Sequence, residues 1–304
     1  MSESAAKITP LESVKALLTG AIDYAGLFPP SQLSMEEAVL NFARYRMSQE
    51  SWLLGRFIVP VARLDELKEA ASPIVEQEKE PWRISALAAE DIYDTFRRLT
   101  RFNEQNSGGF LVDTLEVKAN TVSKIENTVD AMPGGVKAFF EIGLGQNFAE
   151  LIATLAIDRQ HAKIRTGGVR PDEFPSSRDI IRFVRTCLAG NVPFKATAGL
   201  HHPIRCYRPL TYAEGGPSGT MHGFLNMFLM TGYARESYKP DTLEELMEEE
   251  FGEVFHFDEL GVTWRGENFL SNWQLERLRR LGIQSFGSCS FEEPVEDLKA
   301  LGLL

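Results

Sequence analysis

The chain of 304 residues has only three cysteines, Cys187, Cys206 and Cys289, and no Cys-x-x-Cys pair. An odd and widely spaced set of cysteines favours neither a disulfide framework nor a zinc ribbon. We therefore expect a reducing compartment, no cofactor and no metal, and we interpret the protein as cytoplasmic.

Positive charge is also scarce, because 32 Lys and Arg face 43 Asp and Glu and give a net charge of -11. A sequence-independent nucleic-acid binder needs a surplus of basic residues, so nucleic acid is not an expected partner. Long apolar runs are missing too: the most apolar stretch, GFLNMFLM at 223–230, is too short to span a bilayer. The start, MSESAAKITP, lacks the pattern of a signal peptide. We expect neither secretion nor a membrane partner.

The chain does contain about eight short apolar runs that alternate with amphipathic stretches, the pattern of parallel strands linked by helices. Eight such units in one domain, 1–304, predict a closed (β/α)8 TIM barrel, with an open doubly wound sheet as the main alternative. Residues 203–265 break this rhythm and predict an insertion or elaborated loop after the seventh strand. The expected strands are 21–27, 56–60, 83–88, 109–117, 136–142, 162–165, 193–197 and 284–287.

Two lysines each end a predicted strand just before a glycine-containing turn, Lys163 in HAKIRTGG and Lys195 in PFKATAGLHH. Strand alternation points both amines into the barrel near its carboxyl-terminal mouth, where barrel enzymes carry their catalytic groups. Two buried cations that lie close together repel, so we expect at least one lysine pKa well below the usual value of about 10.4. A neutral lysine amine attacks carbonyl groups and forms a Schiff base. Two surface lysines are the plainer alternative.

Four segments in this order, VKAFFEIG, AKIRTGG, PFKATAGLHH and FGSCSF, resemble those of the class I aldolase family of 2-deoxyribose-5-phosphate aldolase. The resemblance covers 136–202 and 284–304, about a third of the chain. It implies that Lys163 forms the imine and that Lys195 lowers its pKa. It also implies a lyase of this type, with a small carbonyl substrate that carries a phosphate group or lacks one. Arg165 and Ala198 depart from the family pattern, which expects a small hydroxyl residue and a glycine there.

The resemblance and the strand ends supply further candidate residues for the site. An anion would bind near Gly199 and the turn from Gly287 to Ser290, where backbone amides and hydroxyls are available at the barrel mouth. An acid on an earlier strand serves as a proton relay in the family, and either Asp113 or Glu116 can face inward, but not both. Glu141 is a second inward acid. The substrate-binding candidates are Asp23, Tyr24, Asp113, Glu116, Arg165, Thr166, Gly167, Thr197, Gly199, Gly287, Ser288 and Ser290.

A pair of histidines, His201 and His202, follows the second lysine strand, and one of them is a candidate acid or base because imidazole titrates near neutral pH. With His222 and Glu141 they also leave open a metal-dependent hydrolase or isomerase. No helical metal-binding spacing supports that alternative. A non-catalytic barrel that binds a sugar phosphate is a third possibility, and a homo-oligomer is a general expectation for soluble proteins.

Overall fold

The computed structural model describes residues 9–76 and 78–304. Eight parallel strands form a closed barrel in the order β1-β13-β7-β6-β5-β4-β3-β2, and β1 pairs with both β13 and β2 to complete the ring. The predicted TIM barrel is therefore confirmed, and each of the eight expected strands is present within a few residues. The barrel strands are β1 Ile22–Tyr24, β2 Leu54–Pro60, β3 Trp82–Leu87, β4 Phe110–Lys118, β5 Lys137–Glu141, β6 His161–Arg165, β7 Phe194–Thr197 and β13 Ile283–Ser288.

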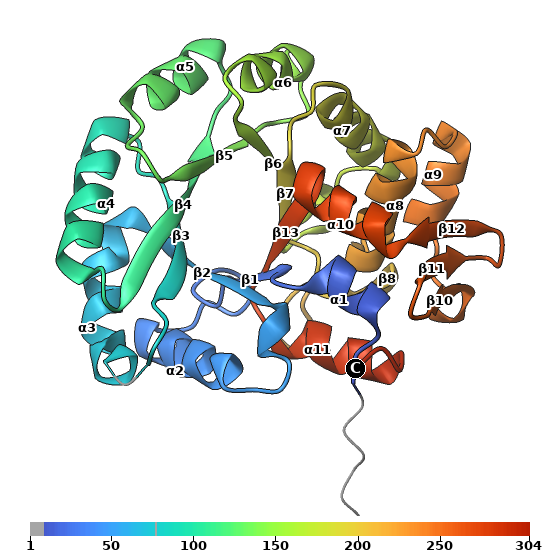
Figure 1. Ribbon diagram of the computed structural model, residues 1–304, viewed down its shortest axis with the longest axis horizontal. Coiled ribbons are helices and arrows are strands. Elements are labelled where there is room, and N and C mark those ends of the chain that lie inside the picture. Colours follow the sequence, from blue (N-terminus) through green and yellow to red (C-terminus); the bar gives the residue numbers. More distant parts are fainter. Residues whose placement is uncertain (1–8, 77) are drawn as a thin grey trace, which may run out of the picture.

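Helices surround this ring, as Figure 1 shows for α2 to α7. Their starts follow the sequence: the Ser34 hydroxyl accepts from the Glu37 N–H in a capping box, and Ser176 caps α7 in the same way. The helices are α1 Glu12–Leu18, α2 Met35–Arg46, α3 Leu64–Val75, α4 Ile92–Asn106, α5 Val122–Ala131, α6 Phe148–Ile157, α7 Ser177–Ala189, α8 Phe224–Arg235, α9 Pro240–Met247, α10 Asn272–Leu281 and α11 Glu292–Ala300. Short 3-10 turns are η1 Ser51–Leu53, η2 Val61–Arg63, η3 Pro171–Glu173 and η4 Gly252–Val254.

The apolar core lies between the outer face of the barrel and these helices. Phe42 of α2 makes edge contacts with Phe57 of β2 and Trp82 of β3, and all three side chains are fully buried. Because strand side chains alternate, outward Phe57 and Trp82 place their neighbours Arg56 and Arg83 inside the barrel. The interior is therefore available for charged side chains, while the hydrophobic burial takes place outside it.

The region 203–265 contains more than a loop. It forms an antiparallel pair, β8 Cys206–Pro209 with β9 Ser218–Met221, and contributes to a three-stranded sheet of β10 Phe255–Phe257, β11 Gly261–Trp264 and β12 Asn268–Ser271. Between them lies α8, whose residues from Phe224 to Tyr233 are all buried. Because Phe224 stacks on Phe286 of β13, α8 covers the barrel as a crossover helix does.

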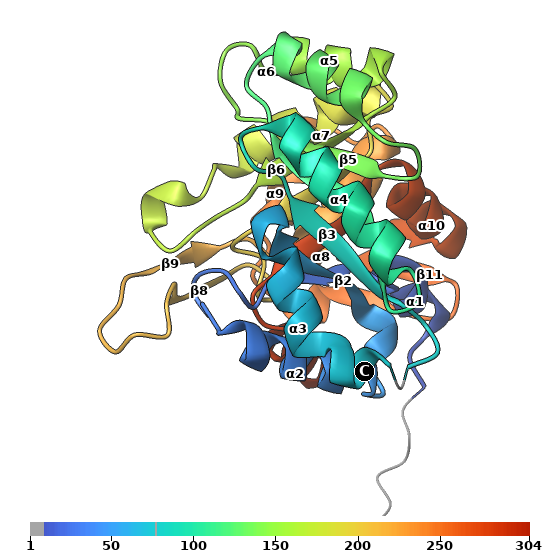
Figure 2. The same ribbon diagram turned by 90° about the vertical axis from the view of Figure 1, so that its left-hand side faces the viewer.

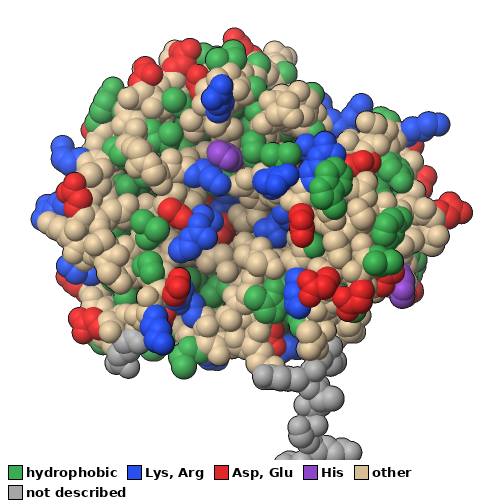
Figure 3. All heavy atoms as spheres, in the orientation of Figure 1, with side chains coloured by type: hydrophobic (Ala, Val, Ile, Leu, Met, Phe, Trp, Pro, Cys, Tyr) green, Lys and Arg blue, Asp and Glu red, His purple; other side chains and the backbone are tan. Residues whose placement is uncertain are grey.

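The two additional sheets lie outside the ring of barrel strands, and the β10–β12 sheet lies beside α9 in Figure 1. The β8–β9 pair extends outward at the side of the carboxyl-terminal strand ends, as Figure 2 shows. The opposite, amino-terminal end faces the viewer in Figures 1 and 3, and charged side chains surround a hollow there.

Within the described residues, no helix is both long enough and apolar enough to cross a membrane. Residues 1–8, on which the prediction of no signal peptide partly rests, lie outside the described residues.

Candidate active site

Strand register assembles a row of charged residues across four neighbouring strands. Lys118 of β4 pairs in register with Glu141 of β5, Glu141 with Lys163 of β6, and Lys163 with Lys195 of β7. Register partners in a parallel sheet present their side chains on the same face. The two lysines, 32 residues apart in the chain, therefore lie side by side in the barrel.

The two lysines do not face each other as bare cations, because Glu116 lies between them. One oxygen of Glu116 is 2.6 Å from the Lys163 amine and the other is 2.8 Å from the Lys195 amine. Lys163 also lies 2.8 Å from Glu141, and Lys195 lies 2.5 Å from Asp23. Five side chains from five strands thus form one ion-pair network.

Neighbouring groups hold the two innermost carboxylates in place. The Ser85 hydroxyl donates to Glu116 at 2.8 Å, and the Ser285 hydroxyl donates to Asp23 at 2.8 Å. The backbone N–H of Arg56 donates to the other Asp23 oxygen at 2.8 Å. A side chain at Gly55 would place its Cβ 2.3 Å from that oxygen, so the Asp23 carboxylate fits only because residue 55 is glycine. Fixed carboxylates in turn fix the lysine amines.

The network keeps its innermost groups charged. Burial opposes ionisation of Glu116, but the two lysines outweigh this effect and hold its pKa well below the usual range. Burial likewise disfavours the Lys195 ammonium, yet Asp23 and Glu116 raise its pKa above the usual value. The low pKa expected for at least one lysine is therefore not that of Lys195, and the expectation that Lys195 lowers the pKa of Lys163 stays a prediction.

The two lysines differ in their access to solvent. Lys163, Glu116 and Glu141 line a cavity of about 330 Å³ at the carboxyl-terminal mouth. A neighbouring cavity of about 550 Å³ shares Glu141 and includes Arg165. The Lys195 side chain is 1% exposed and lines neither cavity. A small molecule that enters the mouth can reach Lys163 but not Lys195.

Two candidates lie away from the mouth. Tyr24 points outward, with its ring packed edge-on against Tyr45 and Phe57 in the core, so its expected substrate contact is wrong. The neighbouring Asp23 points inward, as strand alternation requires. Asp113 forms ion pairs with Arg56 at 2.6 Å and Arg83 at 2.5 Å, nearer the amino-terminal end of β4 than Glu116. Its expected place beside the substrate is therefore also wrong.

The turn after β6 packs against the turn after β7. The Thr166 hydroxyl donates to the carbonyl of Ala198 at 2.7 Å. A Cβ added at Gly167 would lie 2.9 Å from the Gly199 Cα and 2.5 Å from the Phe174 ring. Thr166, Gly167 and Gly199 thus pack two turns against each other beneath Phe174. Anion binding beside Gly199 stays a prediction.

The turn after β13 also has internal partners. Ser288 is buried and its hydroxyl accepts from the Ser290 N–H, while the Ser290 hydroxyl accepts from the Glu293 N–H at the start of α11. Gly287 faces Thr197 across the β7–β13 pair, since an added Cβ would lie 3.3 Å from the Thr197 hydroxyl. Gly287 and Thr197 remain at the mouth, and their contact with substrate stays a prediction.

Both histidines after β7 turn toward α11 and away from the lysines. His201 contacts Glu293 at 3.2 Å and Cys289 at 3.9 Å, and His202 contacts Asp297 at 2.6 Å. Burial disfavours the imidazolium of His201, but its bonds to Cys289 and Glu293 prevail and raise its pKa to about 10. The contacts of His201 are with Glu293 and Cys289 and not with either lysine, and its expected acid–base role stays a prediction.

The three histidines do not converge on one point. His222 bonds the Pro175 carbonyl through Nε2, whereas His201 and His202 bond different carboxylates of α11. Across residues 9–76 and 78–304, no group of three or more His, Cys, Asp or Glu is arranged to hold a metal ion. Cys187, Cys206 and Cys289 are free thiols.

Sequence reasoning missed four members of the site: Ser85, Ser285, Gly55 and the Arg56 N–H. Ser85 and Ser285 lie on predicted strands, and alternation could have placed them inward with Glu116 and Lys195. Gly55 carries no such signal, because its role depends on how closely β1 approaches β2. That distance is a property of barrel closure and not of local sequence.

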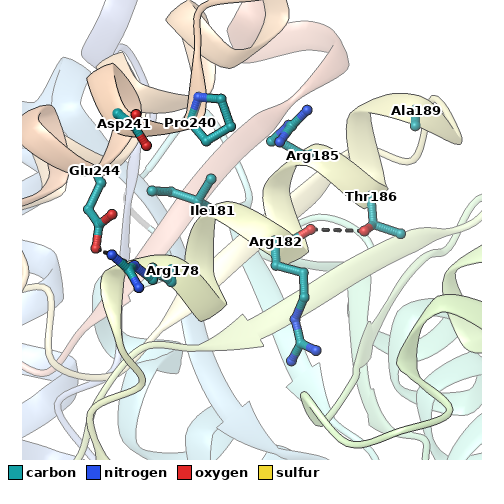
Figure 4. A pocket seen from close by; sticks show the side chains of 9 residues that line it. All are labelled: Arg178, Ile181, Arg182, Arg185, Thr186, Ala189, Pro240, Asp241 and Glu244. Carbon is teal, nitrogen blue, oxygen red and sulfur yellow. Dashed lines mark hydrogen bonds and ion pairs between the residues drawn. The ribbon is translucent and has the colours of Figure 1, made fainter.

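A second cavity of about 550 Å³ lies outside the barrel, between α7 and α9. Figure 4 shows Arg178 of α7 paired with Glu244 of α9, beside Arg182, Arg185 and Pro240. Its charged groups lie on exposed helix faces, and no buried acid–base pair enters it. The chemistry-bearing side chains are therefore at the barrel mouth.

Comparisons of this chain with family models, curated proteins and solved structures found no match.

Proposed function

We propose that this protein is a class I aldolase-like lyase, which makes or breaks a carbon–carbon bond in a small carbonyl compound through an imine on Lys163. The observation that carries the proposal is the Lys163 amine, held between Glu116 and Glu141 at the floor of a cavity in the barrel mouth. The resemblance of four sequence segments to such aldolases supports the same reaction.

Lys163 is the nucleophile because, of the two buried lysines of the network, it is the one that lines the cavity. Lys195 is enclosed and bonded to two carboxylates, so it keeps its proton and acts as a fixed positive charge. Glu116, whose pKa is lowered, stays ionised between the two amines. Glu141 is the partner of Lys163 that also lines both cavities, so it is the group placed to accept the Lys163 proton.

The reaction begins when Glu141 takes a proton from Lys163 and the free amine adds to the substrate carbonyl. The resulting carbinolamine loses water and leaves an iminium ion. The iminium ion draws the electrons of the bond between the α-carbon and the β-carbon as that bond breaks, and an enamine forms. A base removes the proton of the β-hydroxyl group, which becomes the released aldehyde. The enamine then takes up a proton on carbon, and water hydrolyses the imine to free the second product and Lys163.

The charges of the network suit this series of reaction steps. Three carboxylates surround two amines, so Asp23, Glu116 and Glu141 exceed the positive charge by one when all five groups are ionised. An iminium carries the same positive charge as the ammonium that it replaces. The carboxylates that stabilise the Lys163 ammonium therefore also stabilise the iminium and the transition state that leads to it.

Borohydride reduction tests the proposal, since it converts an imine into a stable secondary amine. The protein is incubated with a panel of small aldehydes and ketones, reduced, and measured by intact mass. We expect one added mass per chain for at least one carbonyl compound, and its loss in Lys163→Met. A panel in which wild type and Lys163→Met gain the same adducts would contradict the proposal.

The acidic charge and the three free thiols support the further proposal of a cytoplasmic enzyme that acts on small molecules. The proposed substrate is a small carbonyl compound, and assembly into a homo-oligomer remains a prediction.

A further inference from the structure

Three basic side chains gather at one side of the barrel mouth, next to Lys163. Lys118 ends β4, Arg165 ends β6, and Lys124 lies in the first turn of α5. All three line the cavity of about 550 Å³ that also includes Glu141. Lys118 and Lys124 line the smaller cavity with Lys163 as well, so the two spaces adjoin along shared walls.

Unlike Lys163, these three basic side chains are not neutralised by carboxylates of the described residues. Within the described residues, neither Lys118 nor Arg165 forms an ion pair, and Lys124 donates to the backbone carbonyl of Glu90 at 3.1 Å. Of the two acids that line the larger cavity, Glu141 is paired with Lys163 and Glu90 has an exposed side chain. A chain with a net charge of -11 thus has a local surplus of positive charge beside its reactive amine.

We infer that this basic rim, formed by Lys118, Lys124 and Arg165, binds an anionic group of the substrate while the carbonyl group reacts with Lys163. The inference rests on the proposed function and names its substrate class: a small carbonyl compound with a carboxylate or a phosphate at its far end. Both anions accept paired hydrogen bonds from a guanidinium and attract ammonium groups, so the rim suits either one.

The position of the rim differs from the anion site that the sequence suggested. At Gly167 and Gly199 the backbones pack against each other under Phe174, and the Ser290 hydroxyl accepts from the Glu293 N–H at the start of α11. The rim lies instead over β4 to β6, on the same side of the mouth as Glu141. An anion held there would orient the carbonyl end toward the Lys163 amine.

Matched pairs of aldehydes, one anionic and one neutral, separate the contribution of the anionic group to binding from that of the carbonyl group. Wild-type protein is reduced with borohydride in the presence of succinic semialdehyde or neutral butanal, and in parallel with glyceraldehyde 3-phosphate or glyceraldehyde. We expect half-saturation of adduct formation at a concentration about tenfold lower for the anionic member of at least one pair, as one charge-assisted bond provides. The pair with the larger ratio distinguishes carboxylate from phosphate.

Variants assign that preference to the rim. Lys118→Met and Arg165→Met should each raise the ratio of anionic to neutral half-saturation concentration about tenfold. Lys68→Met, which replaces an exposed lysine on α3, should leave that ratio unchanged. Equal ratios in wild type and in both rim variants would overturn the inference while imine formation, and thus the proposed function, stands.

A binding measurement that needs no imine separates the two failures. Calorimetric titration of the wild-type protein with inorganic phosphate and with succinate should show binding that Arg165→Met weakens about tenfold and Lys68→Met does not. Such binding without any borohydride-stable adduct would support the rim and contradict the proposed function. Binding that Arg165→Met leaves intact would contradict the rim.

Discussion

Lys163 and Lys195 share a single carboxylate, that of Glu116, whose two oxygens lie 2.6 Å and 2.8 Å from their amines. This arrangement binds three buried charges into one unit, and stability and chemistry both depend on it. A buried carboxylate between two cations is costly to remove, because its loss leaves like charges together without compensation. The consequences can be measured separately for each residue.

Glu116→Gln should lower the free energy of unfolding by about 3 kcal/mol at pH 7, since it removes one member of a buried ion-pair network. Urea denaturation followed by circular dichroism measures the change. Glu66→Gln, which removes the exposed partner of Arg63 on α3, is the matched control and should shift the midpoint little. Equal midpoint shifts in the two variants would contradict a stabilising role for the Glu116 network.

The same network sets a pH window for stability. The pKa of Glu116 is lowered from 4.5, so its contribution is present above pH 4.5 and is lost as the pH falls toward its folded-state pKa. The pKa of Lys195 is raised from 10.5, so its contribution is present below pH 10.5 and is lost as the pH rises further. The stability difference between wild type and Glu116→Gln should be constant from pH 5.5 to 9 and shrink in acid, as denaturation at each pH would show.

Gly55→Ala should disturb the site by displacing Asp23, because the new Cβ would lie 2.3 Å from the Asp23 carboxylate. We expect a loss of about 2 kcal/mol in unfolding free energy, typical of overpacking, together with slower imine formation as Lys195 loses its fixed partner. Gly108→Ala is the control, since nothing lies within 4 Å of an added Cβ there. If both variants behave like wild type, then neither stability nor imine formation requires the close packing of Asp23 of β1 against Gly55 of β2.

Glu141→Gln should slow adduct formation at pH 7 by about a hundredfold, because the acceptor of the Lys163 proton is removed while the nucleophile remains. The defect should diminish at alkaline pH, where hydroxide in solution removes the proton instead. Rapid-quench borohydride reduction across pH 7 to 10 gives the rates. A slow rate that stays equally slow at every pH would assign Glu141 to positioning and not to proton transfer.

Much of the barrel could be predicted from sequence because each strand is a short apolar run between amphipathic helices, and periodicity reports that alternation directly. Alternation also placed Lys163 and Lys195 together. The expectation that only one of Asp113 and Glu116 can face inward is wrong, because both pair with side chains inside the barrel. The register with β3 shifts by one residue at Asp113, which breaks simple alternation along β4.

The remaining site residues depend on tertiary structure. His201 and His202 lie in a loop without periodicity, and their direction follows from the carboxylates of α11, 92 and 95 residues further along the chain. Glu116 became the shared partner of both lysines only when β4 and β7 met across the barrel interior. No local pattern predicts a contact between two residues that lie 79 positions apart in the sequence.

The most direct test of the account is the location of the reduced adduct. After borohydride reduction with a reactive aldehyde, peptide mass spectrometry should place the added mass on Lys163, and not on the enclosed Lys195 or on exposed lysines such as Lys68. Lys163→Met should gain no adduct under the same conditions, whereas Lys68→Met should be labelled like wild type. An adduct that maps mainly to other lysines, or that persists in Lys163→Met, would contradict the assignment of Lys163 as the imine-forming residue.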